Sequence, residues 1–279
     1  MTETFYVAAH LVVAAMYVAV ALRVWNLLHA DTAAVAGWRD WPIAVLIVLH
    51  GALLALGLFG SGGVRFGFAH ALSATLWLTV LLLWLEGFLV PMRGLHPLVL
   101  PVAGVCAVLP ALFHGAPIAV GHGGGALRLH LLVAILAYSL LTIAALHALL
   151  MAALDRQLHA AAPDRDRPAQ RLFRHAPPLL AMETQLFRLI TIGFVLLTAT
   201  VASGVLFSEA VYGKPLRFEH KTVFAIASWL IFGALVFGRH VFGWRGRVAL
   251  RWTFVGFAML LLAYVGARFV LEVILQRAA

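Results

Sequence analysis

Eight apolar stretches, each about as long as a membrane-crossing helix, constrain this chain more than any other feature. A helix needs roughly 20 consecutive apolar residues to cross the hydrocarbon core of a bilayer. The stretches take up nearly two thirds of the 279 residues, so the sequence predicts an all-α membrane protein, a polytopic bundle of about eight transmembrane helices. The expected spans are residues 5–28, 41–59, 66–90, 96–113, 127–154, 186–206, 222–241 and 252–274.

The composition leaves no room for a separate soluble domain. Hydrophobic residues make up 63% of the chain and charged residues 11%, whereas a soluble domain is about half apolar and a quarter charged. We therefore expect residues 1–279 to form a single integral membrane domain. It would consist of a five-helix part (1–154), a charged, proline-bearing cytoplasmic linker (155–178) and a three-helix part (179–279).

The basic residues predict both a partner and an orientation. The net charge of +9 is expected to favour the anionic headgroups of the lipid bilayer, and no soluble basic face remains for a nucleic acid. One side of the predicted bundle collects most of the arginines, including five between Arg156 and Arg174. Because cytoplasmic loops are enriched in Lys and Arg, that side is predicted to be cytoplasmic, with both termini outside.

Thirteen histidines are the second notable feature, because a polar side chain inside a bilayer must find a partner or line a site. Each one taken singly is better explained as a packed residue that bonds a neighbouring helix. Few carboxylates accompany them, and Cys106 is the only cysteine, which argues against a structural zinc, a calcium site or covalent haem attachment. The set is compatible with axial ligation of haem iron. The histidines expected near the outer face are His10, His70, His114, His122, His130 and His220.

Two histidines are the leading ligand candidates by position. His130 sits at the outer start of the fifth span, where its ring could meet a haem whose propionates reach water. Arg128, Lys221 and Arg268 lie on the same side and could hold those propionates. Lipid phosphate is the alternative partner for each cation, and it is favoured for Arg128 alone. His50 lies ten residues into the second span, where it needs either a metal or a buried hydrogen bond.

Four sequence pieces between His50 and the C-terminus resemble a known family. They are "LHGAL" at His50, "LHLLVAILAYSLL" at His130, "PPLLAMETQLF" before the sixth span, and "FEHKTVFAIASWLI" followed by "GWRGR". On these pieces the chain resembles the CcsA/CcmC type of cytochrome c assembly membrane proteins, and most closely their YpjD-like branch. The resemblance implies a multi-pass protein of the bacterial inner (cytoplasmic) membrane.

The resemblance also implies a haem-handling segment. In the family, an outer loop of the type W-D-P-K-E-T-W is followed by a Trp eight residues after the Lys. Phe218, Glu219, Lys221, Phe224 and Trp229 fit that spacing as aromatic, acid, lysine, aromatic and tryptophan. Two tryptophans have thus become phenylalanines. Where the family has a proline and an inner glutamate, this chain has His220 and Thr222.

The histidine pattern of the family is only partly kept. The family's outer histidine matches His130, whereas its membrane histidine falls at Phe237, with His240 one turn further on, and its last outer histidine has no counterpart. The second axial ligand would then come from His220, His122 or His70. His220 is favoured because it lies inside the haem-handling segment.

The predicted function is non-covalent binding of haem b, which the protein would hold or deliver for cytochrome maturation alongside other assembly proteins. The chain would orient the cofactor and shield it from water, and it lacks the cysteines for thioether chemistry, so it is expected to be an assembly factor rather than an enzyme. The expected cofactor-binding residues are His130, His220, His50, Lys221, Trp229 and Arg268. The alternative is a transporter, or an accessory subunit of one, that passes a metal ion or small solute along His50, Glu86 and the outer histidines. A third alternative is a structural partner of a larger membrane complex.

Overall fold

The computed structural model describes residues 3–29, 41–59, 64–88, 93–118, 124–158, 178–212, 220–270 and 274. Its elements, in chain order, are α1 (Glu3–His29), α2 (Trp41–Phe59), β1 (Val64–Phe66), α3 (Phe68–Glu86), the 3₁₀ turn η2 (Arg93–Leu95), α4 (His96–Leu112), β2 (Ala116–Ile118), α5 (Gly124–Leu158), α7 (Leu179–Tyr212), α8 (His220–Val241), α9 (Gly246–Leu261), the π-helical turn η3 (Leu262–Gly266) and α10 (Ala267–Phe269).

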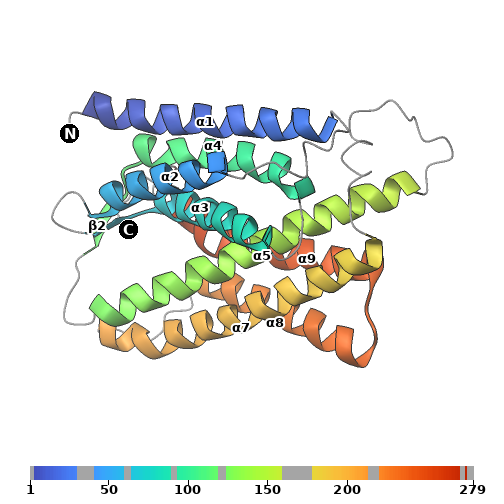
Figure 1. The fold of residues 1–279 in the computed structure, drawn as a ribbon. Coiled ribbons are helices and arrows are strands. Elements are labelled where there is room, and N and C mark those ends of the chain that lie inside the picture. The colour runs from blue at the N-terminus through green and yellow to red at the C-terminus, as the bar shows by residue number, and fades with distance from the viewer. Residues whose placement is uncertain are drawn as a thin grey trace.

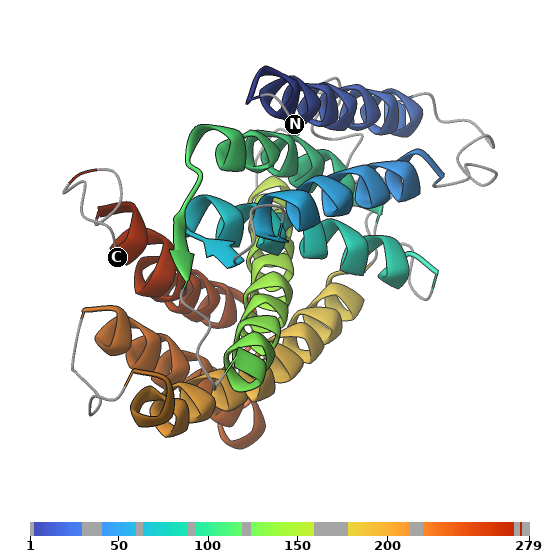
Figure 2. The same ribbon diagram turned by 90° about the vertical axis from the view of Figure 1, so that its left-hand side faces the viewer.

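The long helix α5 divides the bundle into two halves. Figure 1 shows α1, α2, α3 and α4 on one side of α5 and α7 and α8 on the other, while α9 crosses α5 in this view. The view turned by 90° shows the same division (Figure 2). α5 packs most extensively on α7, and it also contacts α3 and α9. The two halves therefore meet largely through α5, and also where α3 contacts η3. The helix that ends the predicted five-helix part packs chiefly on the first helix of the three-helix part.

The two ends of the bundle differ in what they carry, and we name them accordingly. At the strand end, β1 and β2 form an antiparallel pair, and the ring of Phe68 contacts those of Phe113 and Phe269. At the arginine end, α5 ends where α9 begins, and Arg247 bonds the carboxylate of Asp155 at 3.1 Å. The start of α1 and the short α10 both lie at the strand end, as an even number of crossings requires.

The predicted fold class is confirmed. Within the described residues, seven helices are long and apolar enough to cross a membrane. The remaining predicted span is α4, a shorter apolar helix of 17 residues that contains Pro101 and Pro110. The chain is therefore an all-α polytopic membrane protein, while the side of the membrane that each end faces stays a prediction.

Several helices begin or end a few residues away from the predicted spans. The third helix begins at Phe68 rather than at residue 66, because Val64–Phe66 pairs with β2 instead. α5 continues to Leu158, into the predicted linker, and α7 begins at Leu179, seven residues before the expected span. The last long helix begins at Gly246 rather than at residue 252.

Close antiparallel packing of α5 on α7 holds the centre of the bundle. A Cβ added at Gly193 would lie 2.8 Å from Cδ2 of Leu141, so the glycine lets the two helices approach this closely. Leu141 is fully buried at this contact. Further toward the arginine end, Nε2 of His147 donates a hydrogen bond of 2.9 Å to the carbonyl of Met182. The two helices are thus joined by both packing and polar contacts along their length.

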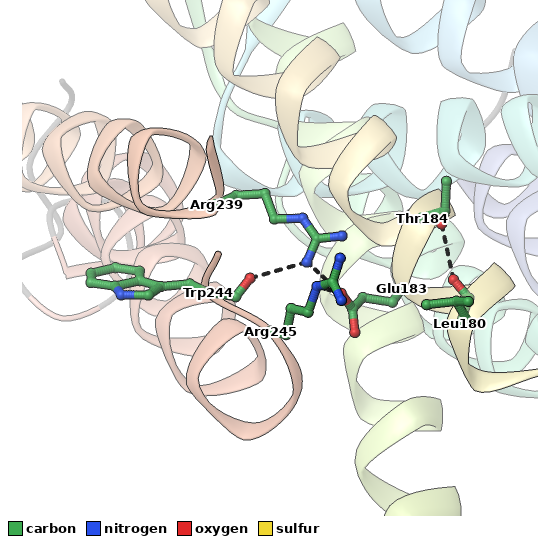
Figure 3. Close-up of polar contacts among 6 residues, drawn as sticks. All are labelled: Leu180, Glu183, Thr184, Arg239, Trp244 and Arg245. Atoms are coloured by element: carbon green, nitrogen blue, oxygen red, sulfur yellow. Dashed lines mark hydrogen bonds and ion pairs between the residues drawn. The ribbon is translucent and has the colours of Figure 1, made fainter. Parts of the chain in front are cut away.

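A carboxylate ties the start of α7 to the turn between α8 and α9 (Figure 3). Glu183 accepts a hydrogen bond from Nη1 of Arg239 at 2.5 Å, and Nε of Arg245 lies 3.5 Å from the same oxygen. The Arg239 guanidinium also donates to the carbonyl of Trp244 at 3.3 Å and lies over the ring of Phe187. Glu183 and Arg239 are only 12% and 19% exposed, so their pairing is shielded from bulk water.

Glu183→Gln should destabilise the fold by about 1–2 kcal/mol, because Arg239 would keep its half-buried charge without a counter-charge. The measurement is the thermal unfolding midpoint of purified protein in detergent. Arg247→Gln is the matched control: it removes the pair with Asp155, but Arg247 is 68% exposed, so its loss should cost less than about 1 kcal/mol. Equal effects of the two variants would contradict the importance assigned to Glu183.

Gly193→Val should lower stability by about 1–3 kcal/mol, because its methyl groups would overlap the buried side chain of Leu141. Adding Leu141→Ala to this variant should recover part of the loss by vacating that space. Gly125→Val is the control within α5, since a Cβ there meets nothing within 4 Å. Unfolding midpoints that are unchanged in Gly193→Val would show that α5 and α7 do not pack as described.

Labelling with a membrane-impermeant thiol reagent should show the strand end outside and the arginine end inside. The experiment uses Cys106→Ala as background and introduces one cysteine at a time, at Arg128 or at Arg245. Arg128→Cys should react in intact cells, and Arg245→Cys only after the membrane is opened, because Lys and Arg concentrate on the cytoplasmic side. The reverse pattern would invert the predicted orientation.

Candidate functional site

His130 occupies the second turn of α5, where that helix meets α7 near the strand end. Its Nδ1 and the Oγ of Ser203 are hydrogen-bonded at 2.8 Å. Its Cε1 lies 3.6 Å from the position that a Cβ would take at Gly204, so the ring rests directly on α7. The side chain is half-buried, and among the described residues its Nε2 has no hydrogen-bond partner. The ring is therefore held at one nitrogen and free at the other.

Trp229 also contacts α7, but from the side of α8. Its Nε1 donates to Oγ1 of Thr198 at 2.9 Å, and its ring stacks on Phe194 with centroids 6.1 Å apart and planes 25° from parallel. Thr198 lies five residues before Ser203, which is about 140° around a helix. Trp229 and His130 thus approach α7 from different sides. α7 is the element that they share.

The structure describes the other predicted residues of this half to differing extents. His220 and Lys221 are the first two residues of α8, and both are exposed. Arg268 lies in α10, but its side chain is outside the described part of the structure. His122 also lies outside the described residues. The structure therefore places His220 and Lys221 at an accessible helix start. The predicted roles of Arg268 and His122 stay predictions.

His50 belongs to the other half of the bundle. Its Nδ1 is hydrogen-bonded to the hydroxyl of Tyr17 at 3.0 Å and its Nε2 to the hydroxyl of Ser73 at 2.9 Å. The side chain is fully buried, and both of its nitrogens are satisfied by hydroxyl groups from α1 and α3. In this arrangement His50 connects three helices, and its role as a ligand remains a prediction.

A further group of imidazoles lies in the same half near the strand end. Tyr6 contacts the rings of His10 and His114, and Nδ1 of His10 donates to the carbonyl of Ala107 at 2.5 Å. Nε2 of His10 and Nδ1 of His70 are buried and have no hydrogen-bond partner among the described residues. Within those residues, however, no three His, Cys, Asp or Glu side chains are grouped so that they could hold a metal ion.

Phe237, the expected counterpart of the family's membrane histidine, and His240, one turn further on, both face away from the core. Phe237 is 59% exposed on α8. His240 is also exposed, and its Nδ1 bonds the carbonyl of Val236 within its own helix. Both lie near the arginine end of α8, far along that helix from His220. Neither is arranged in this structure to share a ligand with His130.

Sequence reasoning missed the residues of α7 that bond two of the predicted side chains, His130 and Trp229. Thr198, Thr200 and Ser203 come from the run "TATVASG" inside an apolar span. Such a cluster of hydroxyl groups was a usable signal, because polar side chains in a membrane helix commonly bond a neighbouring helix. The pairing with His130 and Trp229 depends on contacts across 73 and 31 residues, and no local pattern reports these.

Comparisons with known proteins agree with the resemblance. A family model described as "Cytochrome C assembly protein" matches residues 38–275. An "Uncharacterized 28.8 kDa protein in nifR3-like 5'region" of Azospirillum brasilense is 32% identical over 214 residues, which is 73% of this chain and 76% of that protein. No solved structure matches the chain significantly.

Two further relatives match over shorter segments. The "Inner membrane protein YpjD" of Escherichia coli (strain K12) is 32% identical over 145 residues, 52% of each chain. The "Cytochrome c biogenesis protein CcsA" of Prochlorococcus marinus (strain MIT 9301) is 34% identical over 97 residues, 35% of this chain and 30% of that protein. The chain thus spans about half of the first of these relatives and less than a third of the second. Because the family model covers most of its length, this polytopic membrane protein belongs to the cytochrome c assembly protein family.

Proposed function

We propose that this protein acts in cytochrome c maturation at the bacterial inner membrane, where it binds haem b non-covalently at its strand end. Family membership and the names of the relatives support the process and the membrane. The haem, its type and its ligands go beyond those comparisons. They are supported by the arrangement of His130 on α7.

The single observation that carries the proposal is the half-free ring of His130. A histidine that ligates a metal through one nitrogen almost always bonds a polar group through the other, which fixes the orientation of the ring. His130 meets this requirement, because Ser203 engages Nδ1 while Nε2 has no partner in the described structure. By contrast, both nitrogens of His50 are engaged. The donor set therefore fits an axial ligand of haem at His130.

The surrounding residues suit the other parts of a haem. When bound, haem would supply an iron with two axial positions and a large apolar ring with two carboxylates. The strand end offers exposed Lys221, and Arg268 lies in α10 on that side, for the carboxylates. Trp229, stacked on Phe194, lies on a different side of α7 from His130 and would support that helix rather than cover the cofactor. Lys221 and Arg268 would bind and orient the cofactor.

His220 is the proposed second axial ligand. It is the first residue of α8 and is exposed at the same end of the bundle as His130. An exposed imidazole at a helix start has no packing to lose when it binds iron, unlike the buried His50. It also lies within the segment that resembles the family's haem-handling loop.

Protein purified from haem-replete cells should show a Soret band that His130→Ala removes, because the ring that holds the iron would be gone. His220→Ala should shift the band and weaken it rather than abolish it. His240→Ala is the matched control: this exposed histidine lies at the arginine end and should leave the spectrum unchanged. Absorption spectra normalised to folded protein provide the test, and a colourless wild-type protein, or a full band in His130→Ala, would overturn the proposal.

A further inference from the structure

We propose that Ser203 is a positioning residue that fixes the tautomer of His130, so that the proton sits on Nδ1 and the Nε2 lone pair is free for iron. This inference rests on the proposed function for its purpose. The tautomer itself is a property of the protein without haem.

The direction of the hydrogen bonds follows from which groups are able to donate. The hydroxyl of Ser203 lies 3.0 Å from the carbonyl oxygen of Thr200 and 2.8 Å from Nδ1 of His130. A carbonyl oxygen only accepts, so the single hydroxyl proton of Ser203 is directed to Thr200. The oxygen of Ser203 is then left to accept, and Nδ1 of His130 must be the donor. In a neutral imidazole this places the lone pair on Nε2.

The helix geometry makes Ser203 suited to this task. Ser203 and Thr200 are three residues apart on α7, so the serine hydroxyl bonds back to a carbonyl of its own helix. The side chain of Thr200 takes no part, because its hydroxyl donates to the carbonyl of Leu196 at 2.9 Å. The chain of proton donation therefore runs from His130 to Ser203 to a backbone atom that no side-chain substitution removes.

The tautomer has a consequence for the bound metal. An imidazole that donates from Nδ1 becomes a more basic ligand at Nε2, and the ring is held in one orientation. Loss of the acceptor should weaken binding and raise the reduction potential of the iron, because a less basic ligand stabilises the oxidised form less well. Outer-sphere partners of this kind are typically worth about 10- to 100-fold in metal affinity.

The first arm of the experiment uses the full-length protein without haem. Nitrogen NMR of ¹⁵N-histidine-labelled protein, with the signal of His130 assigned by its absence in His130→Asn, should show a protonated Nδ1 and a bare Nε2. In Ser203→Ala this population should shift toward exchange between the two tautomers. A wild-type His130 that is protonated on Nε2 would overturn the inference, whether or not the protein binds haem.

The second arm adds haemin and measures its affinity and reduction potential. Ser203→Ala should bind about 10-fold or more weakly and show a raised potential, whereas Ser203→Thr should restore both by returning the hydroxyl. Thr200→Ala is the matched control on the same helix, because it keeps the carbonyl that accepts from Ser203, and it should behave as wild type. Wild-type affinity and potential in Ser203→Ala would overturn the positioning role.

The two arms separate this inference from the proposed function. If wild-type protein binds no haemin, the proposed function fails, and the tautomer measured in the first arm still decides the role of Ser203. If haemin binds through His130 but Ser203→Ala changes neither tautomer nor potential, the function stands and the inference is wrong. If Ser203→Ala unfolds, Ser203→Thr and Ser203→Cys, which differ in how well they accept a hydrogen bond, keep both readouts measurable.

Discussion

The close antiparallel contact between α5 and α7 is the interaction on which the rest of the structure depends. Gly193 against Leu141 brings the two backbones together at the centre of the bundle. On either side of that contact, His130 meets Ser203 and His147 meets the carbonyl of Met182. Without close packing at the centre, these polar groups would not reach across. α5 also joins the two halves, because it packs on α3 as well as on α7 and α9.

The histidines show why a polar residue in a membrane helix is not by itself a ligand. His10 presents the same pattern as His130, with Nδ1 donating and Nε2 without a partner in the described structure. It is fully buried, however, whereas His130 is half-buried at an end of α5, where a large cofactor could approach. His50 is both buried and doubly bonded. A histidine that ligates haem must be accessible and must have a ring nitrogen without a partner. Of these three histidines, only His130 combines the two properties.

The fold class was readable from sequence because hydropathy reports burial in lipid, which does not depend on partners. The helix boundaries were harder to read from sequence, because they depend on contacts that hydropathy ignores. The pairing of Val64–Phe66 with β2 shortens α3. α7 reaches back to Leu179, and Glu183 lies in its first turns. For the candidate site, His130 could be proposed from its place at a helix start. Ser203 could not, since its role depends on the register between two long helices.

The pieces of sequence shared with the family fall into two physical groups. "METQ" and "GWRGR" meet at the arginine end, where Glu183 binds Arg239 and Arg245 beside the carbonyl of Trp244 (Figure 3). These residues join helices through Oε1 of Glu183. The piece around His130 lies at the other end, where Nε2 of the His130 ring has no partner in the described structure. A relative could therefore keep the arginine-end pieces to preserve the fold while changing its ligands at the strand end. This is why membership of the family alone establishes the scaffold, and why the chemistry has to be argued from the ring of His130 and the hydroxyl that holds it.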